Sequence, residues 1–134
     1  MSHFYFELQS QDQFDFLTKN SKVCVIDFYT KWCGPCKALS PALEKKVKDD
    51  TDLFPFVCTN HTNINVNDLK GKVLFVKINV EEHEKLSTAF NISSIPHIAF
   101  YSNGSLQKNV VMGNNPDKII SIVKELVELN QVSS

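Results

Sequence analysis

Two cysteines separated by two residues offer the clearest chemistry in this sequence. Cys33 and Cys36 flank Gly34-Pro35, after the apolar run Val23–Tyr29 and at the start of a helical pattern. A thiol at a helix N-terminus lies beside unpaired N–H groups and the positive end of the helix dipole, and both lower its pKa. We therefore expect Cys33 to be the nucleophile toward a substrate disulfide. Cys36, one helical turn further inside and close enough to form a disulfide with Cys33, is the expected resolving thiol.

The apolar run before the cysteines carries a single charged residue, Asp27. A run of this kind is typical of a strand buried on both faces near the centre of a parallel sheet. Burial would raise the pKa of the Asp27 carboxyl and make it a plausible base for the proton of Cys36. In the alternative interpretation the strand is less buried, and Asp27 points to solvent.

Alternating strand and helix patterns predict how these residues are positioned. Strands are expected near 4–8, 23–29, 72–80, 95–101 and 106–111, and helices near 10–17, 33–48, 81–90 and 115–127. Asn103-Gly104 predicts a hairpin between the last two strands. This order indicates an α/β fold with a mixed five-stranded sheet and four flanking helices. Residues from about 50 to 71 form an insertion before the third strand, and we expect it at the end of the sheet opposite Cys33.

Length and charge limit the classes of partner. The 134 residues fit a single domain, 1–134, and the formal net charge is −1. A balanced charge gives no support for a nucleic-acid or anionic-membrane partner. The sequence shows neither an apolar run long enough to span a bilayer nor a secretory or transit signal, so we expect a cytoplasmic protein.

The other cysteines call for separate interpretation. Cys58-x2-His61, together with Cys33 and Cys36, has the spacing of zinc ligands. The expected fold places the two pairs far apart, so we predict no metal site. Cys58 is then either a passive thiol or, as the alternative, a regulatory one, and Cys24 is expected in the core.

The residues around the cysteines resemble those of the thioredoxin family. The matching positions are Asp27-Phe28, Trp32-Cys33-Gly34-Pro35-Cys36-Lys37, Pro41, Ile95-Pro96, Gly104 and Gly113. The resemblance implies the thioredoxin fold and a protein-disulfide reductase that supports cell redox homeostasis. It implies no bound cofactor, because electrons come from NADPH through thioredoxin reductase. It further implies disulfide-containing partner proteins, such as a peroxiredoxin or ribonucleotide reductase, and we expect a monomer.

The resemblance also assigns roles to individual residues. Lys77 resembles the lysine that tunes the buried aspartate, and Ile95-Pro96 resembles the family's cis-proline dipeptide. The implied substrate-binding surface consists of Trp32, Gly34, Pro35, Ile95, Pro96 and Gly113. Three features depart from the family pattern: His97 follows the proline where threonine is common, Ser93-Ser94 stand where many members have glycine, and the connection from about 50 to 71 is longer. We interpret His97 as a space-filling strand residue, with tuning of the thiols as the alternative.

Two other functions fit the same dithiol. A redox sensor would use the disulfide state to gate a partner without catalytic turnover. An oxidase or isomerase would work in a secretory compartment, but such members usually carry histidine between the cysteines, where this chain has Gly34-Pro35. The combination of Cys33, Cys36 and Asp27 favours a catalytic reductase.

Overall fold

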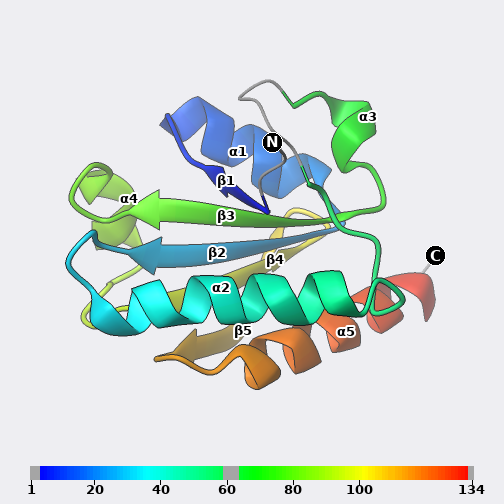
Figure 1. The fold of residues 1–134 in the computed structure, drawn as a ribbon. Helices are drawn as coiled ribbons and strands as arrows, with labels where there is room; N and C mark the ends of the chain where they lie inside the picture. The colour runs from blue at the N-terminus through cyan, green and yellow to red at the C-terminus, as the bar shows by residue number, and fades with distance from the viewer. Residues whose placement is uncertain (1–3, 59–63, 133–134) are drawn as a thin grey trace.

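A mixed five-stranded sheet forms the centre of the molecule (Figure 1). The computed structural model describes residues 4–58 and 64–132. The strand order is β1-β3-β2-β4-β5. β1, β3 and β2 are parallel, β4 is antiparallel to β2, and β5 is antiparallel to β4. The strands are β1 (Tyr5–Glu7), β2 (Val23–Tyr29), β3 (Val73–Asn79), β4 (His97–Ser102) and β5 (Ser105–Met112).

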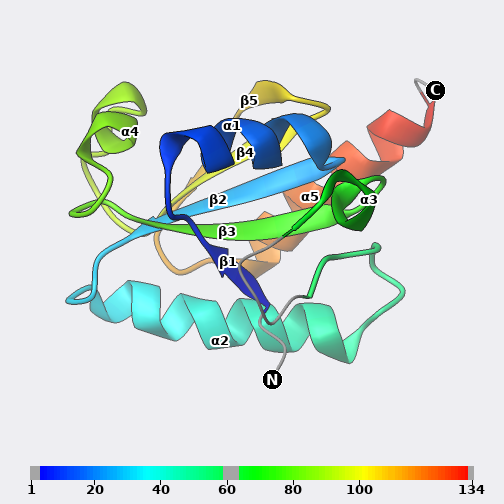
Figure 2. The ribbon, with the colours of Figure 1, turned by 90° about the horizontal axis from the view of Figure 1, so that it is seen from above.

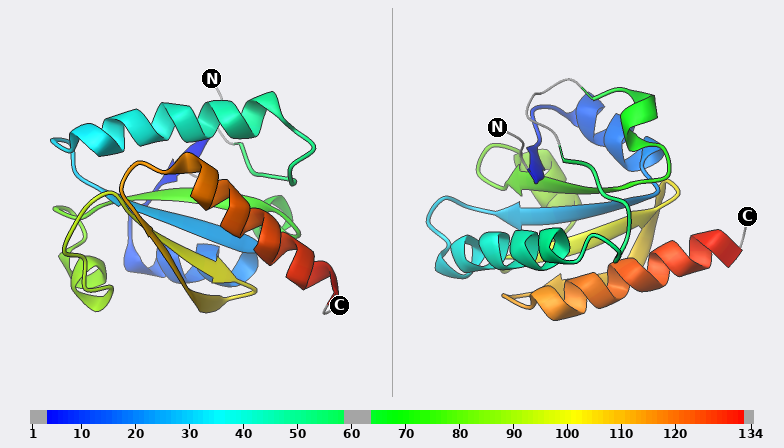
Figure 3. Two further views of the ribbon diagram at one scale, coloured as in Figure 1. Left: turned by 90° about the horizontal axis from the view of Figure 1, so that it is seen from below. Right: turned by 45° about the vertical axis from the view of Figure 1, so that its right-hand side comes forward.

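Helices cover both faces of the sheet, as the sequence predicts. The helices are α1 (Gln11–Asn20), α2 (Gly34–Asp49), α3 (Val66–Leu69), α4 (Glu84–Ala89) and α5 (Pro116–Val132). α2 and α5 lie on one face, where Leu39, Leu43 and Val123 pack in the same cluster as Val25 and Phe75. α1 lies on the other face (Figures 2 and 3). The two hydrophobic cores therefore hold β2 between two layers of helices.

The central strand β2 has the burial that its sequence predicts. Its residues from Val23 to Phe28 are all buried, and it pairs with β3 on one side and β4 on the other. Alternating side chains enter opposite cores, because successive residues of a strand point to opposite faces. Val25 belongs to the α2–α5 core, so Asp27, two residues further along, points to the same face.

The described residues contain one helix more than the four predicted. The short helix α3 lies in the segment expected to be an irregular connection, and it is stabilised locally by a capping box. The Asn65 side chain accepts a hydrogen bond from the Asp68 amide, and the Asp68 carboxylate accepts one from the Asn65 amide. Leu69 anchors this helix in the core that contains α1. Figure 1 shows that this segment follows the far end of α2, away from Cys33, as predicted.

Some element boundaries differ from the prediction because side chains and turns fix them. α4 begins at Glu84 and not at residue 81, because the residues before it form a turn. In this turn the Glu81 amide donates a hydrogen bond to the Asn79 side-chain oxygen. β4 begins at His97, immediately after a cis peptide bond between Ile95 and Pro96.

The predicted hairpin joins β4 and β5. Asn103 and Gly104 both have positive φ angles, 50° and 82°, as this tight turn requires.

Candidate active site

Cys33 and Cys36 form a disulfide at the start of α2, with their Cα atoms 5.2 Å apart. Cys33 is the N-cap residue of this helix, and its Sγ accepts a hydrogen bond from the Cys36 amide at 3.1 Å. A thiolate formed at Cys33 would lie at the positive end of the helix dipole and keep an amide donor within reach. Cys33 is 8% exposed and Cys36 2% exposed, so Cys33 is the more accessible of the two sulfurs.

Asp27 is buried in the middle of the sheet with an exposure of 1%. This confirms the buried interpretation over the solvent-facing alternative. Burial raises the pKa of its carboxyl from 3.8 to about 7, and the positive charge of Lys77 opposes part of that rise. A carboxyl with a pKa near neutrality can accept a proton and release it again at physiological pH.

Lys77 lies next to Asp27, where the sequence resemblance places it. The two residues are paired in register between β2 and β3. The Lys77 ammonium lies over two aromatic rings, 5.1 Å from the centre of the Tyr5 ring and 4.6 Å from that of Tyr29. These contacts hold the positive charge beside the carboxyl through cation–π attraction.

The edge strand β1 contributes two residues that the sequence analysis did not single out. The Tyr29 hydroxyl donates a hydrogen bond to the Glu7 carboxylate, and both Glu7 Oε atoms lie within 2.9 Å of the hydroxyl oxygen. Glu7 is paired in register with Lys77, so this lysine has a carboxylate on each neighbouring strand. Tyr5 directs its hydroxyl toward Asp27. The alternation of apolar and polar residues in β1 did not predict these contacts, because they depend on the register between β1 and β3.

The loops after β2 and before β4 lie at the same end of the sheet as the start of α2, where Cys33 is the N-cap residue (Figure 1). Trp32 is 82% exposed, and a side chain at Gly34 would meet no atom within 4 Å. The Ile95–Pro96 bond is cis, as the resemblance implies. Gly113 has a φ of 88° and its amide donates to the Pro96 carbonyl at 3.0 Å, which ties the end of β5 to the proline loop.

One further residue on this surface was not predicted. Met112 precedes Gly113, is 61% exposed, and its Sδ accepts a hydrogen bond from the Ser94 hydroxyl at 3.3 Å. Methionine is a flexible apolar side chain that adapts to different partners. Met112 lies at the end of the edge strand β5, and the sequence pattern of this strand gives no distinctive signal for a role at this surface.

His97 packs away from α2. The next residue, Ile98, belongs to the α2–α5 core, so His97 points to the opposite face, where its ring contacts Phe28 edge-on with centroids 5.9 Å apart. Burial lowers its pKa, and its Nδ1 atom has no hydrogen-bond partner among the described residues. A neutral, packed ring on this face fits the space-filling interpretation.

We expect His97→Thr to leave disulfide-reductase activity and the pKa of the Cys33 thiol unchanged. The smaller side chain removes ring packing, so the free energy of unfolding should fall by roughly 1–3 kcal/mol. The rate of Cys33 alkylation, measured against pH, reports the thiol directly. A large change in that profile would show that His97 tunes the thiols.

The remaining cysteines lie outside this surface. Cys24 is fully buried, and burial raises the pKa of its thiol to about 12, so it is an inert core residue as predicted. Cys58 is exposed. His61, the other half of the zinc-like spacing, lies outside the described residues. Within residues 4–58 and 64–132, no group of three or more potential ligands is arranged to hold a metal ion.

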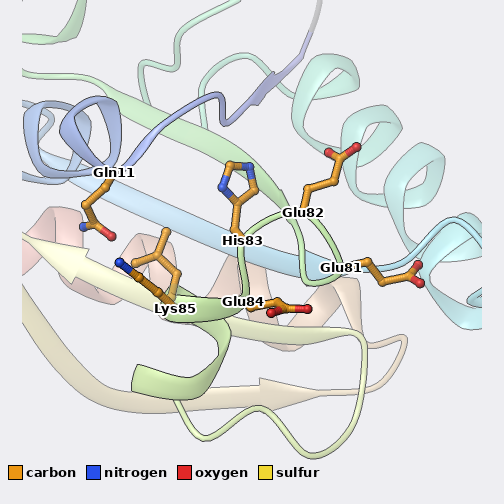
Figure 4. A pocket seen from close by; sticks show the side chains of 7 residues that line it. Gln11, Glu81, Glu82, His83, Glu84 and Lys85 are labelled. Carbon is orange, nitrogen blue, oxygen red and sulfur yellow. The ribbon is translucent and has the colours of Figure 1, made fainter.

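A pocket at the turn between β3 and α4 is separate from the cysteines. Figure 4 shows its labelled side chains, which include Glu81, Glu82 and Glu84 together with His83. The three carboxylates do not converge on one point. The His83 Nε2 atom already contacts the Leu8 carbonyl at 3.1 Å. We therefore assign no ligand to this pocket.

Known proteins share both the sequence pattern and the fold. The family model described as thioredoxin matches residues 5–125. The chain belongs to the thioredoxin family. A thioredoxin of Malassezia sympodialis is 30% identical over 118 residues, which is 88% of this chain and 94% of that protein. The oxidised structure of mitochondrial thioredoxin 3 from Saccharomyces cerevisiae has a TM-score of 0.68 and 26% identity, and the match covers 90% of this chain and 94% of that chain.

A third similar structure concerns the thiol-resolving mechanism of a yeast mitochondrial 1-Cys peroxiredoxin through the glutathione and thioredoxin systems. It matches with a TM-score of 0.67 and 26% identity over 90% of this chain and 94% of that chain. Thioredoxin-family membership and a Cys-x-x-Cys disulfide identify a dithiol–disulfide oxidoreductase of the protein-disulfide reductase type.

Proposed function

We propose that Cys33, Cys36 and Asp27 carry out reduction of protein disulfides in two exchange steps. The Cys33 thiolate attacks one sulfur of the substrate disulfide, forms a mixed disulfide and releases the first substrate thiolate. Cys36 gives its proton to Asp27 and attacks the Cys33 sulfur, which releases the second substrate thiolate. Two electrons pass from the dithiol to the substrate, and the chain is left with the Cys33–Cys36 disulfide.

The observation that carries this proposal is the position of the two sulfurs on α2. Cys33 is at the helix N-cap with an amide donor at its sulfur, whereas Cys36 is more deeply buried. The first setting favours a thiolate at neutral pH, and the second keeps the resolving thiol protonated until a base removes the proton. Asp27, with its pKa raised to about 7, supplies that base, and Lys77 tunes it.

The exposed loops beside the cysteines receive the substrate chain in this proposal. Trp32, Gly34, Pro35, Ile95, Pro96 and Gly113 form the binding surface implied by the family resemblance. Pro96 lacks an N–H group, so in this proposal a substrate strand pairs with other backbone groups of the same loop. Met112 extends the same surface.

The electron route follows from family membership. We infer that a thioredoxin reductase transfers electrons from NADPH to the disulfide, so the chain takes part in electron transport without a cofactor of its own. We propose the disulfides of a peroxiredoxin and of ribonucleotide reductase as substrates, and a similar yeast structure that concerns a peroxiredoxin supports the first. In the described part of the chain, no helix is both long and apolar enough to cross a bilayer. We propose a single-domain, monomeric protein in the cytoplasm, although several of its relatives are mitochondrial.

NADPH consumption in the presence of thioredoxin reductase and insulin tests this function. We expect turnover by the wild-type chain and none by Cys33→Ser, because a hydroxyl cannot replace the attacking thiolate. Cys58→Ser is the matched control, since it removes an exposed thiol at the other end of α2 and should keep full activity. Absence of wild-type turnover, with a disulfide that small thiols still reduce, would favour the redox-sensor alternative.

A further inference from the structure

Three polar atoms are buried together between the sheet and α2. They are the Tyr5 hydroxyl oxygen and the two Asp27 carboxyl oxygens, and none has a fully formed hydrogen bond among the described residues. Buried polar groups in native proteins are almost always paired, so a cluster of unpaired ones calls for a functional explanation. In an otherwise apolar core, these groups can satisfy one another with a small movement of a hydroxyl.

The sheet register brings Tyr5 and Asp27 together. Tyr5 is paired with Phe75 on β3, and Asp27 is paired with Lys77, two residues further along the same strand. Both side chains therefore point to the face covered by α2. The Tyr5 hydroxyl interacts there with the Asp27 carboxyl and with the Ser40 hydroxyl, although neither contact has the distance and angle of a formed hydrogen bond. Tyr5 thus lies between the buried acid and the active-site helix.

Ser40 links this cluster to the resolving cysteine. Its hydroxyl donates to the Cys36 carbonyl at 3.3 Å, one turn along α2. The Tyr5 hydroxyl has one proton and two oxygen neighbours that can accept it: the Asp27 carboxylate and the Ser40 hydroxyl. Its choice between them depends on whether Asp27 is ionised.

Charged groups around the cluster come from β1, β3 and α2. β3 contributes Lys77, β1 contributes Glu7, and α2 contributes Glu44, which faces Tyr5. Tyr29 on β2 holds Glu7 through its hydroxyl, and β4 contributes the apolar Ile98 opposite Asp27. Lys77 is the positive charge that stabilises ionised Asp27, and Glu7 opposes it.

We propose that Tyr5 is a positioning residue for Asp27: its hydroxyl donates to the carboxylate when Asp27 is ionised and turns to Ser40 when Asp27 holds the proton. The inference deepens the proposed function and rests on Asp27 being the base for Cys36. Tyr5 makes the ionised carboxylate available without leaving it unpaired in the core. The reducing cycle needs both states, because Asp27 must be ionised before Cys36 attacks and protonated afterwards.

Tyr5→Phe tests the donor role, since it removes the hydroxyl and keeps the ring against Phe4 and Phe75. Loss of a hydrogen bond to the charged form should raise the pKa of Asp27 by about one pH unit or more. The titration is followed by carbon-13 NMR of the labelled Asp27 carboxyl in the oxidised protein, in which Cys33 and Cys36 do not titrate. Asp27→Asn identifies the signal, and the thermal midpoint of Tyr5→Phe confirms that the variant is folded.

Two further variants make the result specific. Tyr29→Phe is the matched control, because its ring also contacts Lys77 while its hydroxyl bonds Glu7, and we expect the Asp27 midpoint to stay where it is. Ser40→Ala leaves the carboxylate as the main acceptor for Tyr5, so the Asp27 midpoint should move down, opposite to Tyr5→Phe. The rate of insulin reduction should decrease on the acid side of its pH profile, and the pH of that decrease should shift in the same direction as the Asp27 midpoint of each variant.

The outcomes separate the inference from the proposed function. An unchanged or lower Asp27 midpoint in folded Tyr5→Phe would overturn the positioning role, even if the wild-type chain reduces insulin. An unchanged or higher midpoint in Ser40→Ala would overturn the exchange with Ser40. A wild-type chain that fails to reduce insulin would contradict the proposed function, and the NMR titrations would still decide the interaction between Tyr5 and Asp27.

Discussion

Asp27→Asn should make the protein more stable than the wild type at pH 8, by roughly 3–4 kcal/mol in the free energy of unfolding. The carboxyl is 1% exposed and its folded pKa is about 7, compared with 3.8 for an ordinary aspartate. Ionising it in the core is therefore unfavourable. Asparagine has nearly the same shape and stays neutral at every pH, so it avoids this cost.

The direction of the pH dependence follows from proton binding. Between pH 3.8 and about 7 the folded wild type holds a proton on Asp27 that the unfolded chain has lost. The unfolded state binds fewer protons in this range, so the free energy of unfolding falls as the pH rises. The decrease in the free energy of unfolding is complete above about pH 7 and absent below pH 3.8.

Urea unfolding of the oxidised proteins at several pH values measures this effect. The stability difference between Asp27→Asn and the wild type should grow from near zero in acid to its full size above neutrality. Asp52→Asn is the control, because Asp52 is exposed and its substitution should leave the pH profile almost unchanged. A difference that does not vary with pH would mean that Asp27 does not titrate as a buried acid.

The same substitution should slow catalysis. Without a base for Cys36, the rate of insulin reduction at neutral pH should fall by about tenfold to a hundredfold. The variant would then be more stable and less active, as is common where function requires a charge in the core. Retention of full activity would remove Asp27 from the mechanism, whatever its effect on stability.

Cys36→Ser should abolish turnover and trap a covalent complex with the substrate. Cys33 can still attack a substrate disulfide, but the serine hydroxyl at position 36 cannot displace the substrate from the Cys33 sulfur. The mixed disulfide therefore accumulates. As residues, Cys33 is 8% exposed and Cys36 is 2% exposed, which is the reason that the trap is expected with one variant and not the other.

Mass spectrometry of the reaction between Cys36→Ser and insulin under non-reducing conditions detects the complex as the mass of insulin added to the chain, and dithiothreitol releases it. Cys33→Ser is the matched variant and should give little adduct, and the double variant with both serines should give none through the active site. Equal adduct from Cys33→Ser would show that Cys36 is an accessible nucleophile and would reverse the proposed roles.

Much of the site was predictable because its determinants are local in sequence. Cys33 and Cys36 are one turn apart at a helix start, and Asp27 is the one charge in a run that the structure confirms as buried. The alternation of strands and helices was sufficient for the α/β class, since each pattern reflects the face that an element buries. The helix α3 was missed, although its capping residues Asn65 and Asp68 are only three positions apart in the sequence, because the surrounding Asn and Thr residues resemble a loop.

The sequence by itself determined the chemical groups, their spacing along the chain and the order of the elements. Only the tertiary structure decided that Tyr5 lies against Asp27, that Lys77 lies between two tyrosine rings, and that His97 points away from α2. These contacts depend on the register of parallel strands and on which face a strand turns toward a helix. Both are fixed by packing between segments far apart in the chain, and a shift of one residue would move every side chain to the other face.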